Sequence, residues 1–245
     1  MLSAPLLSAF ILALSLGFTA LGSNASENLP GTIPSKRTQE FPWMSVATWE
    51  RMHAEDVLIA EHDQVDLLFI GDSITAGWDW QLWQTHFAPL KAANFAIGAD
   101  HTGNVLWRLQ HGTIGQLHPK LIVVLIGVNN LGHLQESPEQ AADGITRVVQ
   151  QLQLAWPNSR ILLNAVFPFD EKADSPNRAK AKRLNSIISK LGNNKTIFFK
   201  DYGHVFLQKD GSIAAEVMAD FLHPTPAGYK IWAEAMTPDI HKLLQ

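Results

Sequence analysis

The stretch Leu67-Leu68-Phe69-Ile70-Gly71-Asp72-Ser73-Ile74-Thr75 decides the expected fold, because an apolar run ends there in a glycine and a polar turn. Such a run is typical of a short strand that is buried on both faces of a parallel sheet. Ligands of open α/β sheets bind beyond the carboxyl ends of the strands, which is where Ser73 is expected to lie. Ser73 is therefore a candidate nucleophile, provided that the chain supplies catalytic partners.

Apolar runs predict five strands in all, at residues 65–71, 92–98, 121–127, 160–167 and 196–201. Amphipathic stretches between and after them predict helices at 43–60, 78–87, 104–110, 138–155, 177–191 and 226–244. This alternation predicts a three-layer α/β/α sandwich around a five-stranded parallel sheet.

The size and composition of the chain fit one globular domain, predicted over residues 41–245. The chain has 245 residues, of which 46% are hydrophobic and 17% charged. A net charge of -4 without a cluster of Lys and Arg argues against nucleic acid as a partner. The sequence has no cysteine, which excludes disulfides, a cysteine nucleophile and thiolate metal sites.

The N-terminal residues predict export. Residues 5–21 are apolar and uncharged, and Ser23-Asn24-Ala25 suits the small residues of a signal cleavage site. Residues 1–25 are therefore predicted to be a signal peptide and 26–40 a linker, with a periplasmic or extracellular mature protein that has no stable membrane insertion. An uncleaved membrane anchor is the alternative, because the apolar stretch is close to the length of a span.

A serine nucleophile needs a histidine to accept its proton and a carboxylate to orient that histidine. Asp220 and His223, three positions apart, offer such a pair, and Pro224-Thr225-Pro226 would hold His223 in a rigid loop before the last helix. Asp201 and His204, just after the fifth strand, offer the same spacing. The spacing alone leaves both histidines open.

An acyl-transfer site also needs hydrogen-bond donors for the developing oxyanion. After the third predicted strand, Asn129 or Asn130 could present a side-chain amide, although asparagine is also common in ordinary turns. After the second predicted strand, the turn at Gly98-Ala99-Asp100 could expose backbone N–H groups.

The chain resembles the SGNH (GDSL) hydrolases in four sequence blocks that occur in the family's order. These blocks are Gly71-Asp72-Ser73, the glycine turn at Gly98-Ala99-Asp100, Gly127-Val128-Asn129, and Asp220 with His223. The chain looks most like the esterases related to the catalytic subunits of platelet-activating factor acetylhydrolase, from about Trp43 to the C-terminus. The resemblance implies a flavodoxin-like α/β sandwich. It implies that Ser73 is the nucleophile, His223 the general base and Asp220 the residue that orients it. It further implies an oxyanion hole of the Ser73 N–H, the Ala99 N–H beside Gly98, and the Asn129 amide, without a metal or organic cofactor.

One position departs from the family pattern, which commonly has Gly-Gly-Asp where this chain has Gly98-Ala99-Asp100. Alanine keeps the N–H group, but it would cost roughly 1–2 kcal/mol if this position needs a positive φ.

The resemblance implies hydrolysis of short-chain esters, acetyl esters above all. Predicted export favours carbohydrate or other small-molecule esters as substrates. The alternative activities are those of a lipid acetylhydrolase of the platelet-activating factor type, a lysophospholipase or a thioesterase. A homodimer is a further expectation for the mature protein.

Two alternatives belong to other classes of protein. A mononucleotide or flavin could bind at the loop after the first strand, but Asp72 would repel phosphate and no Lys or Arg lies between residues 70 and 90. A non-catalytic carbohydrate binder could use Trp78, Trp80 and Trp83 as a stacking surface, although tryptophans at this spacing also suit core packing.

Overall fold

The fold is described from a computed structural model, and the description covers residues 30–245. The predicted signal peptide at 1–25 and the first residues of the predicted linker lie outside these residues. Within 30–245, no helix is both long enough and apolar enough to cross a membrane.

The predicted five-stranded parallel sheet is confirmed. Its strands lie in the order β2-β1-β3-β4-β5, and every neighbouring pair is parallel. The strands are β1 (Leu67–Gly71), β2 (Ala92–Asn94), β3 (Leu121–Leu125), β4 (Arg160–Asn164) and β5 (Ile197–Lys200). Because β1 lies between β2 and β3, the turns that follow these three strands meet at one edge of the sheet.

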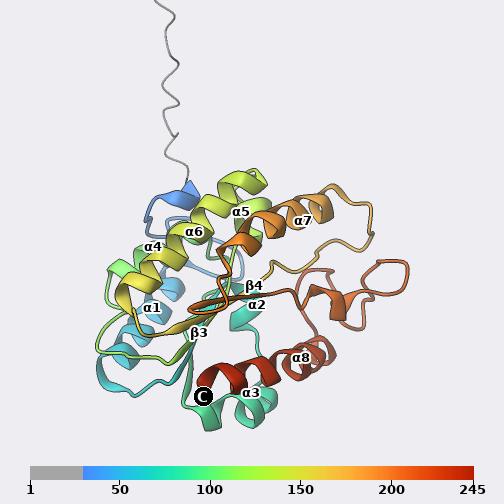
Figure 1. The fold of residues 1–245 in the computed structure, drawn as a ribbon. Coiled ribbons are helices and arrows are strands. Elements are labelled where there is room, and N and C mark those ends of the chain that lie inside the picture. The colour runs from blue at the N-terminus through green and yellow to red at the C-terminus, as the bar shows by residue number, and fades with distance from the viewer. Residues whose placement is uncertain (1–29) are drawn as a thin grey trace, which may run out of the picture.

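Helices cover both faces of the sheet, so the three-layer prediction is also confirmed (Figure 1). On one face lie α1 (Val46–His62), α4 (Thr102–Gln110), α6 (Pro138–Ala155) and α7 (Pro176–Ile188), and on the other α3 (Trp80–His86) and α8 (Pro226–Leu244). Two short helices, α2 (Ser73–Ala76) and α5 (Val128–Gly132), begin close to the ends of β1 and β3. The short 3₁₀ segments are η1 (Pro30–Thr32), η2 (Ala88–Leu90), η3 (Ser189–Leu191) and η4 (Gly203–Phe206).

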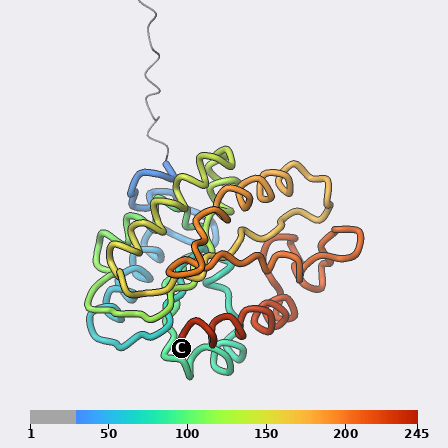
Figure 2. Tube along the Cα trace, in the orientation of Figure 1, coloured from blue at the N-terminus to red at the C-terminus, as the bar shows by residue number. Residues whose placement is uncertain are grey.

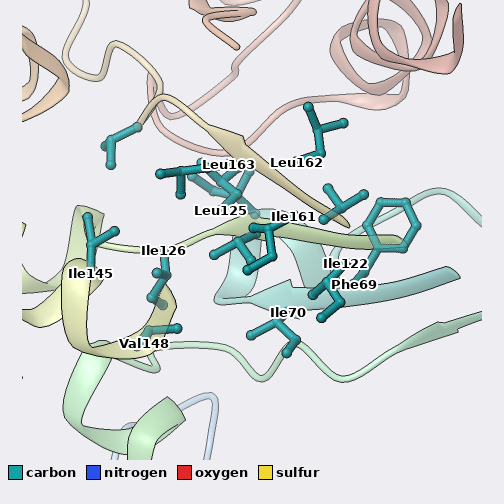
Figure 3. Packing of buried hydrophobic residues seen from close by; sticks show 14 of the residues in the cluster. Phe69, Ile70, Ile122, Leu125, Ile126, Ile145, Val148, Ile161, Leu162 and Leu163 are labelled. Atoms are coloured by element: carbon teal, nitrogen blue, oxygen red, sulfur yellow. The ribbon is translucent and has the colours of Figure 1, made fainter. Parts of the chain in front are cut away.

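The core lies between the sheet and its helices. All five residues of β1 and of β3 are buried, as expected for strands covered on both faces. In Figure 3, Ile145 and Val148 of α6 lie beside Ile126, which follows β3. Burying an aliphatic side chain of this size contributes about 1.5–3 kcal/mol, so this packing holds the strand ends rigidly.

The second strand is shorter than predicted, ending at Asn94 instead of continuing to residue 98. The Asn94 side chain donates to the Thr75 carbonyl at 2.8 Å and accepts from the Ala96 N–H at 3.1 Å. Side-chain bonds of this kind compete with a strand ladder, so the chain leaves the sheet here. The Phe95 N–H still donates to the Phe69 carbonyl of β1 at 2.9 Å, and residues 96–100 then form a turn at the sheet edge.

The suggested tryptophan stacking surface does not form. Trp78 is buried and packs face to face on Trp232 at 4.4 Å, and Trp83 packs edge-on against Phe69. Of the three tryptophans, Trp80 alone is exposed, at 71%.

The described part of the predicted linker packs on the domain. In Figure 2, the blue segment that begins at Pro30 runs beside helices of the upper layer, and contacts join η1 to α4 and α6. The Gly31 N–H donates to Glu136 at 2.9 Å, and Thr102 Oγ1 donates to the Gly31 carbonyl at 2.6 Å. A Cβ at Gly31 would lie 2.3 Å from Asn130 Nδ2, so only glycine fits this close approach.

Candidate active site

Ser73 is the first residue of α2 and lies directly at the end of β1. Asp72 caps this helix, because its side chain accepts from the Ile74 N–H at 3.0 Å. A Cβ at Gly71 would come within 2.5 Å of the Leu125 carbonyl, so the tight exit from the strand requires glycine. The turn leaves the Ser73 side chain half-buried at the edge of the sheet.

A chain of hydrogen bonds joins Ser73 to the loop before α8. Ser73 Oγ lies 2.8 Å from His223 Nε2, although 150 residues separate the two in sequence. His223 Nδ1 lies 2.7 Å from Asp220 Oδ2. A histidine in this position can accept the hydroxyl proton, and the carboxylate can fix its tautomer and orientation.

Asp220 also shapes its own loop. Its Oδ1 accepts from the backbone N–H of His223 at 2.8 Å and of Leu222 at 3.1 Å. Partial burial raises the pKa of Asp220, but the hydrogen bonds from His223 and Leu222 outweigh it and hold the pKa below its ordinary value. Asp220 is therefore the ionised partner that an imidazolium at position 223 would need.

The rival pair lies elsewhere. His204 Nδ1 lies 3.0 Å from the backbone carbonyl of Asp201, while the Asp201 carboxylate accepts from the Gly203 N–H at 2.8 Å. Both residues line a cavity of about 640 Å³ between α7 and the ends of β4 and β5, and Ser73 is not among its lining residues. Of the two candidate histidines, His223 is the one that the structure brings to Ser73.

In the turn after β2, Ala99, the residue that departs from the family pattern, has a left-handed conformation. Ala99 has a φ of +59°, a region that costs an ordinary residue roughly 1–2 kcal/mol. Phe221, between Asp220 and His223, is also left-handed, with a φ of +58°. Such conformations persist where surrounding contacts determine them, and they gather at functional sites.

Asn129 and Asn130, the two candidates for an oxyanion-binding side-chain amide, have different hydrogen-bond partners. Asn129 Nδ2 donates to the Asp100 carbonyl at 2.8 Å, so its amide lies against the turn that contains Ala99. Asn130 bonds instead to Thr102 and Glu136 and is completely buried. The candidate residues Ser73, Ala99 and Asn129 thus follow β1, β2 and β3, three neighbouring strands of the sheet.

Sequence reasoning missed a buried charge network beneath this turn. Asp100 Oδ2 accepts from Arg108 Nε at 2.9 Å, and Asp100 Oδ1 accepts from Arg37 at 3.1 Å and from Trp49 Nε1 at 2.7 Å. Burial raises the pKa of Asp100, and the positive charges of Arg108 and Arg37 oppose that shift. The sequence around Asp100 does not indicate which distant arginine pairs with it, so this network could not be predicted.

The chain belongs to the GDSL-like lipase/acylhydrolase family, whose model matches residues 69–231. It is accordingly a carboxylic ester hydrolase.

The chain is 35% identical over 202 residues to human platelet-activating factor acetylhydrolase IB subunit alpha2, covering 80% of this chain and 85% of that one. Its fold is similar to a GDSL-like lipase from Bacteroides thetaiotaomicron, with a TM-score of 0.65, 20% identity and coverage of 80% and 98%. It is also similar to a carbohydrate acetylesterase from Sinorhizobium meliloti, with a TM-score of 0.57, 17% identity and coverage of 73% and 99%.

Proposed function

We propose that this protein is a serine esterase that removes short acyl groups, acetyl above all, from carbohydrate or other small-molecule alcohols. The observation that carries the proposal is the unbroken hydrogen-bond chain from Ser73 through His223 to Asp220. A serine hydroxyl is a weak nucleophile unless a base takes its proton, and this chain supplies that base.

The reaction proceeds in two steps. Ser73 Oγ attacks the ester carbonyl carbon while His223 Nε2 takes the hydroxyl proton, and the protonated His223 then passes that proton to the departing alcohol. Water attacks the carbonyl carbon of the resulting acyl-Ser73 and gives one proton to His223. As the bond between that carbon and Ser73 Oγ breaks, His223 returns the proton to Ser73 Oγ, which releases the carboxylic acid and free serine. Asp220 stabilises the imidazolium in both steps.

The negative charge on the carbonyl oxygen is stabilised by three donors: the backbone N–H groups of Ser73 and Ala99 and the side-chain amide of Asn129. An amide nitrogen has two N–H bonds, and the Asp100 carbonyl occupies one of those on Asn129. The other can donate to the oxyanion. Donors whose direction the fold has already fixed lower the free energy of the transition state without a further cost of reorganisation.

The preference for acetyl groups rests on similar proteins. The human relative is a platelet-activating factor acetylhydrolase subunit, and the Sinorhizobium neighbour is a carbohydrate acetylesterase. Both names describe removal of an acetyl group, from alcohols of different chemistry.

An exposed tryptophan beside the Ala99 turn favours a sugar as the alcohol. Trp43 is 58% exposed and stacks on Phe41 at 5.1 Å between ring centroids. A Cβ at Gly98 would lie 3.1 Å from Trp43 Cζ3, so the indole lies against the turn. A flat, exposed ring beside this turn can stack on a pyranose. The export predicted from the N-terminal residues also fits an external carbohydrate substrate better than an intracellular lipid.

The second candidate function is hydrolysis of the acetyl group of a platelet-activating-factor-type phospholipid. The observation in its favour is the 35% identity with the human subunit over most of both chains.

A panel of substrates tests the proposal. Wild-type protein is assayed with p-nitrophenyl esters from acetate to octanoate, with acetylated xylose and with an acetylated ether phospholipid, and Ser73→Ala serves as the control. We expect the highest kcat/KM for acetate esters, deacetylation of the sugar, and loss of all turnover in the control. Turnover retained in Ser73→Ala would overturn the serine mechanism, and a preference for the phospholipid over the sugar would favour the second candidate.

A further inference from the structure

Arg37 is a buried cation in the segment that precedes the first helix. It is 3% exposed and lies 61 residues before the turn that it contacts. The segment around it is fixed against the start of α4, because the Ser35 N–H donates to the Gly103 carbonyl at 3.0 Å and Asn104 Nδ2 donates to the Ser35 carbonyl at 2.9 Å. The guanidinium is therefore carried to its position by backbone that is itself anchored.

The guanidinium bridges the two residues that flank Ala99. Arg37 Nη2 donates to the Gly98 carbonyl at 2.6 Å and to Asp100 Oδ1 at 3.1 Å. One nitrogen thus connects the residue before Ala99 with the residue after it. Asp100 is further held by Arg108 and Trp49, and its carbonyl by Asn129.

This bridge acts on the strained point of the turn. Ala99 is left-handed, and an alanine that is free to relax would return to a negative φ. A rotation at Ala99 changes the direction of its N–H group relative to Ser73. Contacts on both sides of a strained residue are what keep it in place.

Arg37 supplies the second of two guanidinium groups that lie beside two buried carboxyl groups. Arg108 donates to Asp56 at 3.0 Å as well as to Asp100 at 2.9 Å. Without Arg37, these two buried carboxylates would share one guanidinium. Unpaired buried charge is strongly unfavourable, so the Asp100 side of the turn would shift or take up a proton.

We propose that Arg37 is a positioning residue for the oxyanion hole, holding the Ala99 N–H in its productive direction by bridging Gly98 and Asp100. The inference rests on the proposed function, because it needs Ala99 to be an oxyanion donor. Arg37 touches no reacting atom and acts through the turn alone.

The test compares Arg37→Gln with Lys36→Gln, its neighbour. Lys36 pairs with Glu50 at the surface and serves as the matched control for loss of a cation from the same segment. We expect Arg37→Gln to lower kcat about 10- to 100-fold, part of the loss that removing a whole oxyanion donor causes. KM should stay within about twofold, and the loss should be equal for acetate and butyrate esters because the oxyanion is common to both. Lys36→Gln should retain wild-type kcat.

A second comparison separates positioning from general destabilisation. Glycine adopts a positive φ without strain, so the turn should depend less on the bridge once Ala99 is replaced. In the Ala99→Gly background, Arg37→Gln should therefore lower kcat by no more than about 3-fold, a coupling that a double-mutant cycle measures. Circular dichroism confirms that each variant is folded at the assay temperature. If Arg37→Gln does not fold, Arg37→Met, which keeps a long unbranched side chain but has no N–H donor for the bridge, replaces it in both comparisons.

The outcomes separate the two proposals. Wild-type kcat in Arg37→Gln, or an equal loss with and without Ala99→Gly, would overturn the role of Arg37 and leave the esterase proposal intact. Turnover retained in Ser73→Ala would overturn the esterase proposal itself, and the inference with it.

Discussion

Asp72, the residue before Ser73, caps a helix but is buried with an incompletely hydrogen-bonded carboxyl group. Its carboxylate caps α2, yet the residue is 1% exposed, and its Oδ2 has no hydrogen-bond partner within residues 30–245. Burial, aided by the charge of Asp100, raises the pKa of Asp72 to about 7 despite the bond from the Ile74 N–H. Below about pH 7, the protonated form of Asp72 is thus favoured in the folded protein.

This shift predicts a pH-dependent stability at the residue scale. Between the unfolded pKa of about 3.9 and the folded value near 7, the folded state holds a proton that the unfolded state has lost. The contribution of Asp72 to stability is therefore complete below about pH 4 and is lost as the pH rises through about 7. Asp72→Asn, which keeps a capping oxygen, should abolish this loss.

Urea unfolding of the wild type and of Asp72→Asn at pH 5 and pH 8 measures the effect. The wild type should lose free energy of unfolding relative to the variant, by at most about 1.4 kcal/mol per pH unit. Asp79→Asn, which replaces the capping aspartate of the neighbouring helix α3, is the control. Parallel pH profiles for wild type and Asp72→Asn would show that the Asp72 carboxyl titrates normally.

At the scale of elements, the last helix positions the proposed base. Thr225 caps α8, accepting from the Gly228 N–H at 3.2 Å, and its own N–H donates to the Val217 carbonyl at 2.9 Å. Within α8, the Tyr229 hydroxyl donates to the Ile74 carbonyl at 2.7 Å, which ties this helix to α2. The loop with His223 is thus fixed at its end by the Thr225 cap of α8, and α8 is itself bonded to α2, the helix that begins at Ser73.

The two histidine loops give a matched pair of variants. His223→Ala should lower kcat by about 100- to 10,000-fold, the range for loss of a general base. His204→Ala, in the loop after β5, should keep activity close to that of the wild type, because His204 bonds to a backbone carbonyl away from Ser73. Steady-state kinetics on p-nitrophenyl acetate distinguishes them, and the reverse order of effects would assign the base to His204.

At the scale of the whole molecule, a cluster of aromatic side chains joins α8 to the loops that leave the sheet. Trp232 is completely buried, stacks on Trp78 after α2 and meets Phe167 after β4 edge-on at 4.8 Å. Three segments that are distant in sequence thus share one packing centre. Rigid packing here keeps the α8 loop aligned with the sheet edge.

Tryptophan substitutions test this packing. Trp232→Ala should lower the free energy of unfolding by about 3–5 kcal/mol, the usual effect of truncating a buried aromatic residue. Trp80→Ala, at an exposed position, should change it by less than about 0.5 kcal/mol. Equal urea midpoints for the two variants would contradict the assigned core.

The sequence by itself determined the class of fold and the candidate residues. Runs such as 67–71 and 121–125 are apolar over their whole length, and 138–155 repeats at helical spacing, so local burial patterns were enough to predict five strands and the longer helices. The short helices α2 and α5 were not predicted, because four or five residues show no period. Motif order along the chain pointed to Ser73, Ala99, Asn129, Asp220 and His223.

Only the tertiary structure brought His223 within hydrogen-bond distance of Ser73, put Ala99 at a φ of +59°, and brought Arg37 beneath it. Each depends on contacts between residues that are tens to 150 positions apart. The conformation of Ala99 and the pairing of Asp100 are set by the packing of several elements at once. Local sequence carries the preferences of each segment, and the free energy of these long-range contacts selects the geometry of the site.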